Sequence, residues 1–238
     1  MHNAQPMPRH PTVFVVDNDA SMRESLAWLL EGVELAVETF ETAEAFLAAC
    51  DPDQPGCLVL DVRLPGMSGI VLQEELAHRG IRLPVIVITG FADVDTAVRV
   101  LKSGAFDFLE KPYADDAMLE RVQQAIALDA ERRRMRAQRE GLLARLSCLT
   151  ARERAVFDQV VLGKANKVVA IEFGISEKTV EAHRARVMHK LGATSLAELV
   201  RMDLMASPFD LRLAMQGSAP PDVRPILRPA PAALRVSA

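Results

Sequence analysis

Acidic, hydroxyl and lysine side chains stand where several short apolar segments of this chain end. The tripeptide Asp17–Asp19 follows the first segment, Asp61 follows the third, and Thr89 and Lys111 come at the ends of the fourth and fifth. Carboxylates held close together repel, and a hard cation such as Mg²⁺ relieves that repulsion while it holds a phosphoryl group. A hydroxyl and an ammonium group would both bind the phosphoryl oxygens. The set is typical of phosphoryl chemistry.

Each of these residues has an ordinary interpretation as well. An Asp at the end of a strand is more often a helix cap or a turn residue than part of an active site. No glycine-rich phosphate loop follows the first apolar segment, so nucleotide binding is not expected. The chemical interpretation therefore depends on whether the fold brings the residues together.

The spacing of apolar residues predicts a doubly wound α/β domain with a five-stranded parallel sheet. The strands are near-continuous apolar runs, which suit burial on both faces, and helical spacing separates them. The carboxyl ends of parallel strands meet at one edge, where Asp17, Asp61, Thr89 and Lys111 would converge. The expected strands are residues 12–16, 35–40, 57–60, 84–88 and 106–109, and the expected helices are 21–30, 43–50, 71–77, 94–101 and 119–128.

A small all-α domain of four helices is expected after this sheet. Residues 129–146 are charged helix formers, so we expect a helical linker with a break near Gly141. Thr150 and Glu153 form a capping-box pattern that begins the first helix of the next domain. Three more helices are expected at residues 166–173, 177–191 and 195–205.

The ends of the chain differ in composition from both domains. Residues 1–11 contain three prolines and predict a flexible arm, and residues 208–238 are rich in Pro and Ala and predict a disordered tail. The expected domains are therefore residues 12–128 and 147–207. Met22, Trp28 and Phe46 are expected to pack in or beside the first core.

Charge is divided unevenly along the chain. Residues 11–128 carry a net charge of −12 and residues 129–238 a net charge of +7. Chance would also give such a split, but it suits an acidic domain joined to one that approaches a polyanion. No apolar run reaches the roughly 18 residues of a membrane span, and the three cysteines form no C-x-x-C pair. We expect a cytoplasmic protein with free thiols and no membrane partner.

Three motifs make the first domain similar to a known family. D-V-R-L-P-G-M-S-G follows the third strand, V-I-T-G lies on the fourth, and D-F-L-E-K-P follows the fifth. Together they resemble the receiver domain of bacterial two-component response regulators. The resemblance implies that Asp61 is the phosphoacceptor, Thr89 the phosphate-sensing hydroxyl, Lys111 the phosphate-pairing ammonium and Phe108 the switch aromatic. It also implies a cis bond before Pro112.

The resemblance also implies a Mg²⁺ site. Its ligands would be Asp17, Asn18, Asp61 and the backbone carbonyl of Arg63. Receivers usually have two adjacent acidic residues after the first strand, and Asn18 takes the second of those positions here. An amide oxygen brings no negative charge, so a weak site is expected. Asp19 would either substitute for it or cap the next helix, the commoner role.

A second, independent match lies in the all-α domain. The segments L-T-A-R-E-R, N-K, I-S-E-K-T-V-E-A-H and K-L-G-A resemble the LuxR-type helix-turn-helix. Two short helices around a glycine would alone suggest an ordinary helical hairpin. Both domains in this order resemble the NarL/FixJ family of response regulators, and its FixJ branch most closely.

The helix after Ser176 would be the recognition helix, with its N-terminal part toward the bases of the major groove and with Arg184 among its outward-facing residues. Val180, Val187 and Leu191 would form its buried stripe. Arg184 or Glu181 would read bases, and lysine and arginine side chains would hold phosphates. His183 is either a contact or a partly buried structural residue. The expected DNA-binding residues are Lys167, Lys178, Thr179, Glu181, Ala182, His183, Arg184 and Arg186.

The resemblance implies a transcription factor controlled by phosphorylation rather than an enzyme. A sensor histidine kinase would phosphorylate Asp61, and a homodimer would then form on promoter DNA and act with RNA polymerase. The alternative is a DNA-binding protein that does not depend on phosphorylation and uses the receiver-like domain for dimerisation or ligand sensing. Asn18 is the feature that favours this alternative.

Overall fold

The computed structural model describes residues 9–90 and 99–206 of the 238-residue chain. The chain divides into two compact units, and the boundary between them along the chain lies between Ala137 and Gln138. We call residues 9–137 the first unit and residues 138–206 the second unit. The expected arm and tail lie almost wholly outside the described residues. Residues 94–98 of the expected fourth helix also lie outside them, and the described residues 99–102 are helical.

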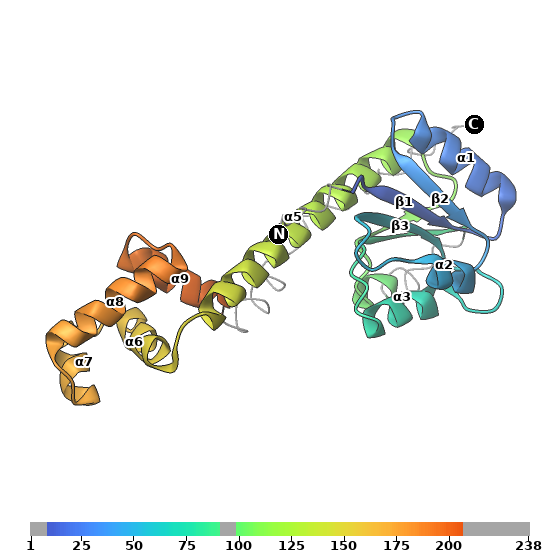
Figure 1. Cartoon of the computed structure of the whole chain (residues 1–238). Helices are drawn as coiled ribbons and strands as arrows, with labels where there is room; N and C mark the ends of the chain where they lie inside the picture. The colour runs from blue at the N-terminus through green and yellow to red at the C-terminus, as the bar shows by residue number, and fades with distance from the viewer. Residues whose placement is uncertain (1–8, 91–98, 207–238) are drawn as a thin grey trace, which may run out of the picture. The chain divides into compact units, whose positions relative to one another are not determined.

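The first unit contains the predicted five-stranded parallel sheet (Figure 1). Its spatial order is β2-β1-β3-β4-β5, and every neighbouring pair is parallel. This order places the first strand in the interior, with crossovers to both sides, as a doubly wound sheet requires. The strands are β1 (Thr12–Val16), β2 (Ala36–Phe40), β3 (Gly56–Asp61), β4 (Val85–Thr89) and β5 (Asp107–Glu110).

Alternate residues of the central strands fill two separate cores. On β1, Val13 and Val15 pack under one face of the sheet, and Phe14 and Val16 pack under the other. The predicted near-continuous apolar runs arise because both faces are covered. One core contains residues of α1 (Ala20–Glu31) and α5 (Asp115–Ser147), and the opposite core contains residues of α2 (Ala43–Ala49) and α3 (Gly69–His78).

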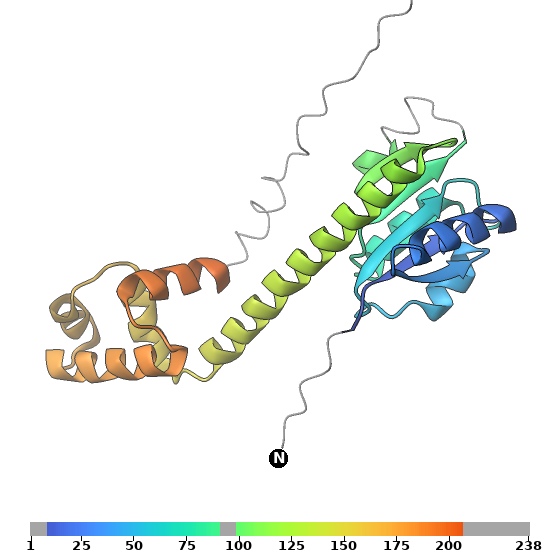
Figure 2. The same ribbon diagram turned by 90° about the horizontal axis from the view of Figure 1, so that it is seen from above.

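The helix α5 is continuous, and the expected break near Gly141 is wrong (Figure 2). A glycine inside a helix costs about 1 kcal/mol relative to alanine. Leu142 follows Gly141 directly and Leu146 lies one turn further on, and both are buried in the core of the second unit, which offsets that cost. The last turns of α5, expected to be part of a linker, therefore belong to the core of the second unit.

Within the first unit, Asp129 ties α5 to the amino end of β3. Its carboxylate is buried and accepts the backbone N–H of Gly56 at 2.9 Å and Nε of Arg133 at 2.7 Å. The guanidinium of Arg133 also donates to the carbonyls of Asp53 at 3.0 Å and Gln54 at 2.7 Å. Gly56 has φ +145°, and a Cβ there would overlap the carbonyl of Thr12. We call Asp129 and Arg133 the α5 anchor.

The second unit is a helical domain around one core. It contains α6 (Ala151–Val161), α7 (Asn166–Phe173), α8 (Glu177–Leu191) and α9 (Leu196–Ala206), together with the last turns of α5. The predicted capping box of Thr150 and Glu153 is present. Lys190 also donates to the buried carboxylate of Glu153 at 2.7 Å. Val180, Val187 and Leu191 are buried as predicted.

The remaining packing predictions have mixed outcomes. Phe46 is fully buried and Met22 is half-buried, but Trp28 is 81% exposed on α1, so its predicted packing role is wrong. All three cysteines are free thiols. Arg9, the first described residue, forms an ion pair with Asp51, and this contact holds the segment before β1 to the rest of the first unit. In the ranges 9–90 and 99–206, no helix combines the length and the apolar character needed to cross a bilayer.

Candidate functional site

Three side chains predicted to converge, those of Asp17, Asp61 and Lys111, do so at the carboxyl edge of the sheet, and Thr89 ends the neighbouring strand β4 there. Asp17, Asp61 and Thr89 lie at the ends of β1, β3 and β4 and are 0%, 7% and 1% exposed. Nζ of Lys111, just after β5, donates to Oδ2 of Asp17 at 2.7 Å and to Oδ2 of Asp61 at 3.2 Å. We call Asp17, Asp61, Thr89 and Lys111 the acceptor cluster.

Backbone contacts hold the members of the acceptor cluster in place. The backbone N–H of Lys111 donates to the carbonyl of Thr89 at 2.8 Å, which joins the ends of β4 and β5. The N–H of Arg63 donates to Oδ1 of Asp61 at 3.2 Å. Gly69, at the start of α3, approaches the carbonyl of Asp61 so closely that a Cβ would overlap it. The peptide bond between Lys111 and Pro112 is cis.

The three polar residues in the loop after β1 have different environments. Asp17 points into the cluster, and its Oδ1 accepts the N–H of Asp19 at 2.9 Å. Asp19 caps α1 through Ser21 and Met22, which is the ordinary role considered for it. Asn18 is exposed. This loop thus contributes one buried carboxylate rather than two.

An arginine that sequence analysis missed supports this loop. Nη1 of Arg23 donates to the backbone carbonyl of Asp17 at 2.7 Å, one turn into α1. Its position on a half-buried helix face gave no signal, because apolar spacing does not specify what a long polar side chain reaches. The contact holds the backbone of Asp17, whereas Lys111 holds its side chain.

Lys111 offsets part of the negative charge of the cluster. Partial burial lowers the pKa of Lys111, but its hydrogen bond to Asp17 and the charges of Asp17 and Asp61 outweigh this effect and raise the pKa above its ordinary value. The ammonium group therefore remains charged. Two carboxylates and one ammonium leave a single net negative charge in a site largely closed to water.

The oxygen donors present fit Mg²⁺. Each carboxylate oxygen of Asp17 and Asp61 accepts a hydrogen bond, and carboxylate oxygens are also the ligands that a hard cation prefers. The amide of Asn18 and the carbonyl of Arg63 are neutral oxygen donors nearby in sequence. In the part of the chain that the structure describes, no group of three or more His, Cys, Asp or Glu is placed to hold a metal ion. The donor chemistry therefore fits Mg²⁺ with less charge than three carboxylates would supply.

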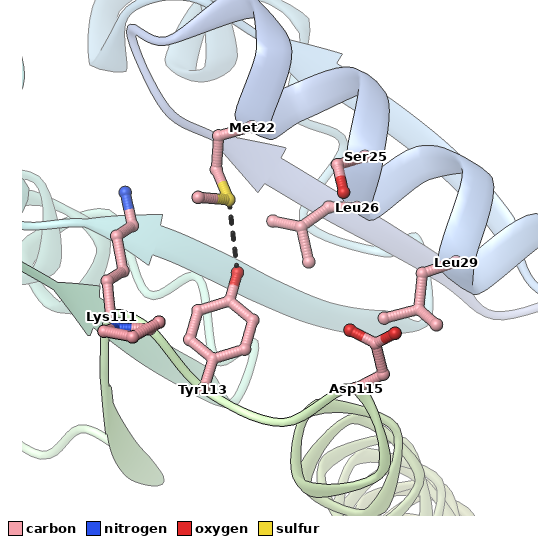
Figure 3. A pocket seen from close by; sticks show the side chains of 8 residues that line it. Met22, Ser25, Leu26, Leu29, Lys111, Tyr113 and Asp115 are labelled. Carbon is pink, nitrogen blue, oxygen red and sulfur yellow. Dashed lines mark hydrogen bonds between the residues drawn. The ribbon is translucent and has the colours of Figure 1, made fainter.

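A small pocket of about 170 Å³ adjoins the cluster between α1 and the start of α5 (Figure 3). The hydroxyl of Tyr113 points toward the sulfur of Met22 and donates to it at 3.4 Å. Burial, followed by the charges of Asp17 and Asp115, raises the pKa of Tyr113 to about 12. The phenol therefore stays protonated beside the acidic cluster.

Phe108, the expected switch residue, is half-buried on the edge strand β5, where it pairs with Val87 of β4. Most residues of β1, β3 and β4 are fully buried, whereas β5 is only partly covered. A large ring at a partly covered edge has room for more than one arrangement, whereas a ring in a close-packed core does not.

The predicted DNA-binding residues of the second unit fall into two groups. His183 and Arg184 are half-buried, and the rest are exposed. Thr179 is hydrogen-bonded through its hydroxyl to the α8 cap, Ser176, at 2.7 Å. The exposed group consists of Lys167, Lys178, Thr179, Glu181, Ala182 and Arg186.

Arg184 and His183 are turned toward the rest of the unit. Nη1 of Arg184 donates to Oδ1 of Asn166 at 3.2 Å, and Nδ1 of His183 is buried. The expectation that Arg184 lies on the outward face of the helix is therefore wrong in part. Sequence analysis did not identify Asn166 as a partner, because the contact joins residues 18 positions apart on two helices.

Comparison with protein families defines the class of both units. Residues 13–123 match the response regulator receiver domain, and residues 147–203 match the luxR family of bacterial regulatory proteins. The chain belongs to the response regulators of the NarL/FixJ family and is a two-component transcriptional regulator. These matches do not favour a receiver-like domain that works without phosphorylation.

The relatives narrow the resemblance to the FixJ branch. The chain is 48% identical over 200 residues to the transcriptional regulatory protein FixJ of Azorhizobium caulinodans, covering 84% of this chain and 95% of that protein. It is 43% identical to the transcriptional regulatory protein TdiR of Thauera aromatica, covering 82% and 86% of the two chains. The solved structure of the response regulator StyR matches with 46% identity and a TM-score of 0.74, covering 81% and 98%.

Proposed function

We propose that Asp61 is the residue phosphorylated by a sensor histidine kinase. The observation that supports this is the pairing of its buried carboxylate with Lys111, beside Thr89 and Asp17. A carboxylate oxygen of Asp61 attacks the phosphorus of the donor phosphohistidine. The new P–O bond forms as the P–N bond breaks, and the histidine leaves. Lys111 pairs with the incoming phosphoryl oxygens and Thr89 donates to one of them.

Asp17, Asn18, Asp61 and the carbonyl of Arg63 would hold Mg²⁺ in this site. When bound, the cation supplies positive charge that offsets the phosphoryl oxygens during transfer. Because Asn18 adds no charge, the affinity is low. Lys111 compensates for part of the carboxylate charge in the absence of the ion, so the resting fold depends little on the metal.

Phosphorylation then changes the surface around β5. Thr89 moves toward the phosphoryl group and Phe108 turns inward, which biases the exposed edge of the receiver between two arrangements. The phosphorylated form dimerises through that edge. A dimer places two DNA-binding domains on two half-sites, which compensates for the modest charge of each domain.

The DNA contacts divide into positioning and specifying residues. Lys167, Lys178 and Arg186 hold phosphates, and Glu181 and Arg184 contribute to base preference. Thr179 and Ala182 are exposed on the same helix, and His183 is half-buried beside them. Lys178→Ala should weaken binding to all sequences and lower the salt slope by about one. Lys164→Ala is the matched control, because its ammonium already pairs with Glu172 at 2.7 Å.

The remaining assignments follow from this function. We propose residues 12–128 as the receiver and 147–207 as the DNA-binding domain, with RNA polymerase as a further partner at promoters. The protein works in the cytoplasm, where the kinase domain and DNA are found. It is a regulator rather than an enzyme, since the phosphoryl group ends on its own side chain.

The experiment that tests the proposal treats the full chain with a small phosphodonor such as acetyl phosphate and Mg²⁺. Mass spectrometry should find one added phosphoryl group, on Asp61, and light scattering should show a shift toward a dimer. DNA selected from a random pool should bind more tightly after treatment. An adduct on another residue, or an adduct without any change in assembly or binding, would contradict the proposal.

A further inference from the structure

The inference concerns how Arg184 is held on the recognition helix. Arg184 lies four residues after Val180 and three before Val187, both of which are buried. Residues at these spacings share one face of a helix, so Arg184 projects from the packed side of α8 rather than from its outer side. Its half-burial agrees with this position, whereas Lys178 and Arg186 are exposed.

The partner on that side is the first residue of α7. Oδ1 of Asn166 accepts Nη1 of Arg184 at 3.2 Å. Ala165 caps α7 without a side-chain hydrogen bond, and Asn166 does not cap the helix either. The amide of Asn166 is therefore not needed at the start of its own helix, and its oxygen accepts the hydrogen bond from Arg184 instead.

We propose that Asn166 is a positioning residue that sets the direction of the Arg184 guanidinium for DNA binding. A guanidinium is planar and carries its N–H donors in a fixed fork, so one hydrogen bond orients all the others. With one donor on Asn166, the remaining donors have a defined direction at the junction of α7 and α8. This inference rests on the proposed DNA contact of Arg184 and adds the residue that acts through it.

The physical benefit is preorganisation. A free arginine side chain loses much rotamer freedom when it binds, and a residue already held in place loses less. Removing the Asn166 amide should therefore weaken binding by about 3- to 10-fold, which is the range for immobilising one flexible side chain. The Asn166 variants keep the positive charge of Arg184, so the salt dependence of DNA binding should not change.

The test is a double-mutant cycle in the phosphorylated full chain, with DNA selected from a random-sequence pool by the unsubstituted protein. Asn166→Ala should lower affinity with an unchanged salt slope, whereas Arg184→Ala should lower both affinity and slope. In the Arg184→Ala background, Asn166→Ala should have no further effect. Base preference selected by Asn166→Ala should broaden at the position that Arg184→Ala also affects.

Controls separate positioning from folding. Asn166→Ser removes the amide but keeps a small polar residue at the start of α7, and it should behave like Asn166→Ala. Gln138→Ala removes an exposed amide elsewhere in the second unit and should bind like the unsubstituted chain. Thermal unfolding followed by circular dichroism should match for all of these variants.

Two outcomes would overturn the inference. Additive losses in the double variant would show that Asn166 acts independently of Arg184, and unchanged affinity and preference in both Asn166 variants would show that it has no part in binding. If Arg184→Ala itself binds normally, the proposed DNA contact of Arg184 fails. That result would not affect the proposal that Asp61 is phosphorylated.

Discussion

The acceptor cluster of the first unit and the exposed face of α8 in the second hold their charges in different ways. In the cluster, one ammonium group is shared between two carboxylates, and Asp17 and Asp61 are almost completely buried. On α8, Lys178 and Arg186 are exposed to water. Charges that share partners in a closed site act as one set, whereas exposed charges act separately.

This difference decides what a substitution does in each place. Removing one charged member of the cluster changes the electrostatic energy of the other charged members, because little solvent is present to screen their interactions. Removing one exposed lysine from α8 removes one phosphate contact and leaves the others unchanged. We therefore expect all-or-none effects in the cluster and graded, additive effects on the recognition helix.

The largest expected effect is that of Asp61→Asn. The amide has nearly the same shape and keeps an oxygen for the N–H of Arg63, so the fold should persist, but it is not a nucleophile toward phosphorus. Labelling from acetyl phosphate should be abolished. Asp53→Asn, on an exposed loop, is the control and should label normally. Residual labelling of Asp61→Asn would remove the acceptor role from Asp61.

The next largest effect is on stability rather than signalling. Asp129→Asn should reduce the free energy of unfolding of the first unit by about 2 kcal/mol, because it weakens charge-assisted hydrogen bonds of a buried group. Hydrogen exchange of β1 and β3 in the full chain measures this. Glu131→Gln is the control, since its exposed pair with Arg134 should contribute little. Equal protection in both variants would show that the α5 anchor is not stabilising.

The fold and the acceptor cluster were predictable because strand ends fix where residues go. Once β1, β3, β4 and β5 are parallel neighbours, Asp61 and Lys111 meet at one edge whatever their sequence separation. The apolar runs and the motifs determine this order. The prediction required no knowledge of side-chain orientation.

Contacts made by long polar side chains were not predictable in the same way. Arg184 was expected to face outward, but its packed neighbours turn it toward Asn166. The break at Gly141 was expected from local propensity, yet burial of Leu142 outweighs it. Trp28 was expected to pack in or beside the first core because it lies on a helix of that domain, and it is exposed. Each of these depends on tertiary neighbours that periodicity does not reveal.

A smaller effect, and a pH-dependent one, is expected at Glu153 in the second unit. Its hydrogen bond from Lys190, followed by that from the backbone of Thr150, lowers its pKa to about 2 from an ordinary value of 4.5. The stabilisation is therefore fully present above about pH 4.5 and is lost as the pH falls toward 2. Glu153→Gln should destabilise the second unit at neutral pH, and the difference from the unsubstituted chain should shrink across that window.

Urea unfolding of the full chain measures this, with the methyl NMR signals of Val156 and Val180 as probes of the second core. Asp158→Asn is the control, because its exposed pair with Arg154 is open to water. A difference that stays constant between pH 5 and pH 2.5 would show that the contribution of Glu153 is not that of a charged carboxylate. Buried carboxylates in the second unit would then not act as part of a charged set, as those of the acceptor cluster do.

The smallest effect, but the sharpest test of the cluster, is that of Asn18→Asp. A second carboxylate beside Asp17 should tighten Mg²⁺ binding by about tenfold, roughly 1.4 kcal/mol, because it adds charge next to a hard cation. It also adds repulsion that Lys111 cannot fully offset, so the metal-free variant should unfold more easily than the unsubstituted chain. Calorimetric titration of the full chain with Mg²⁺ measures the affinity without any phosphorylation.

Asp19→Asn is the matched variant, because it exchanges the same two groups one residue further along. Asp19 caps α1, and asparagine caps equally well, so Mg²⁺ affinity should change less than twofold, roughly 0.4 kcal/mol. If Asp19→Asn instead loses affinity while Asn18→Asp gains none, then Asp19 faces the metal. The cluster would then hold three carboxylates around one ammonium group, and its dependence on Mg²⁺ would be greater than that of a cluster with a single net negative charge.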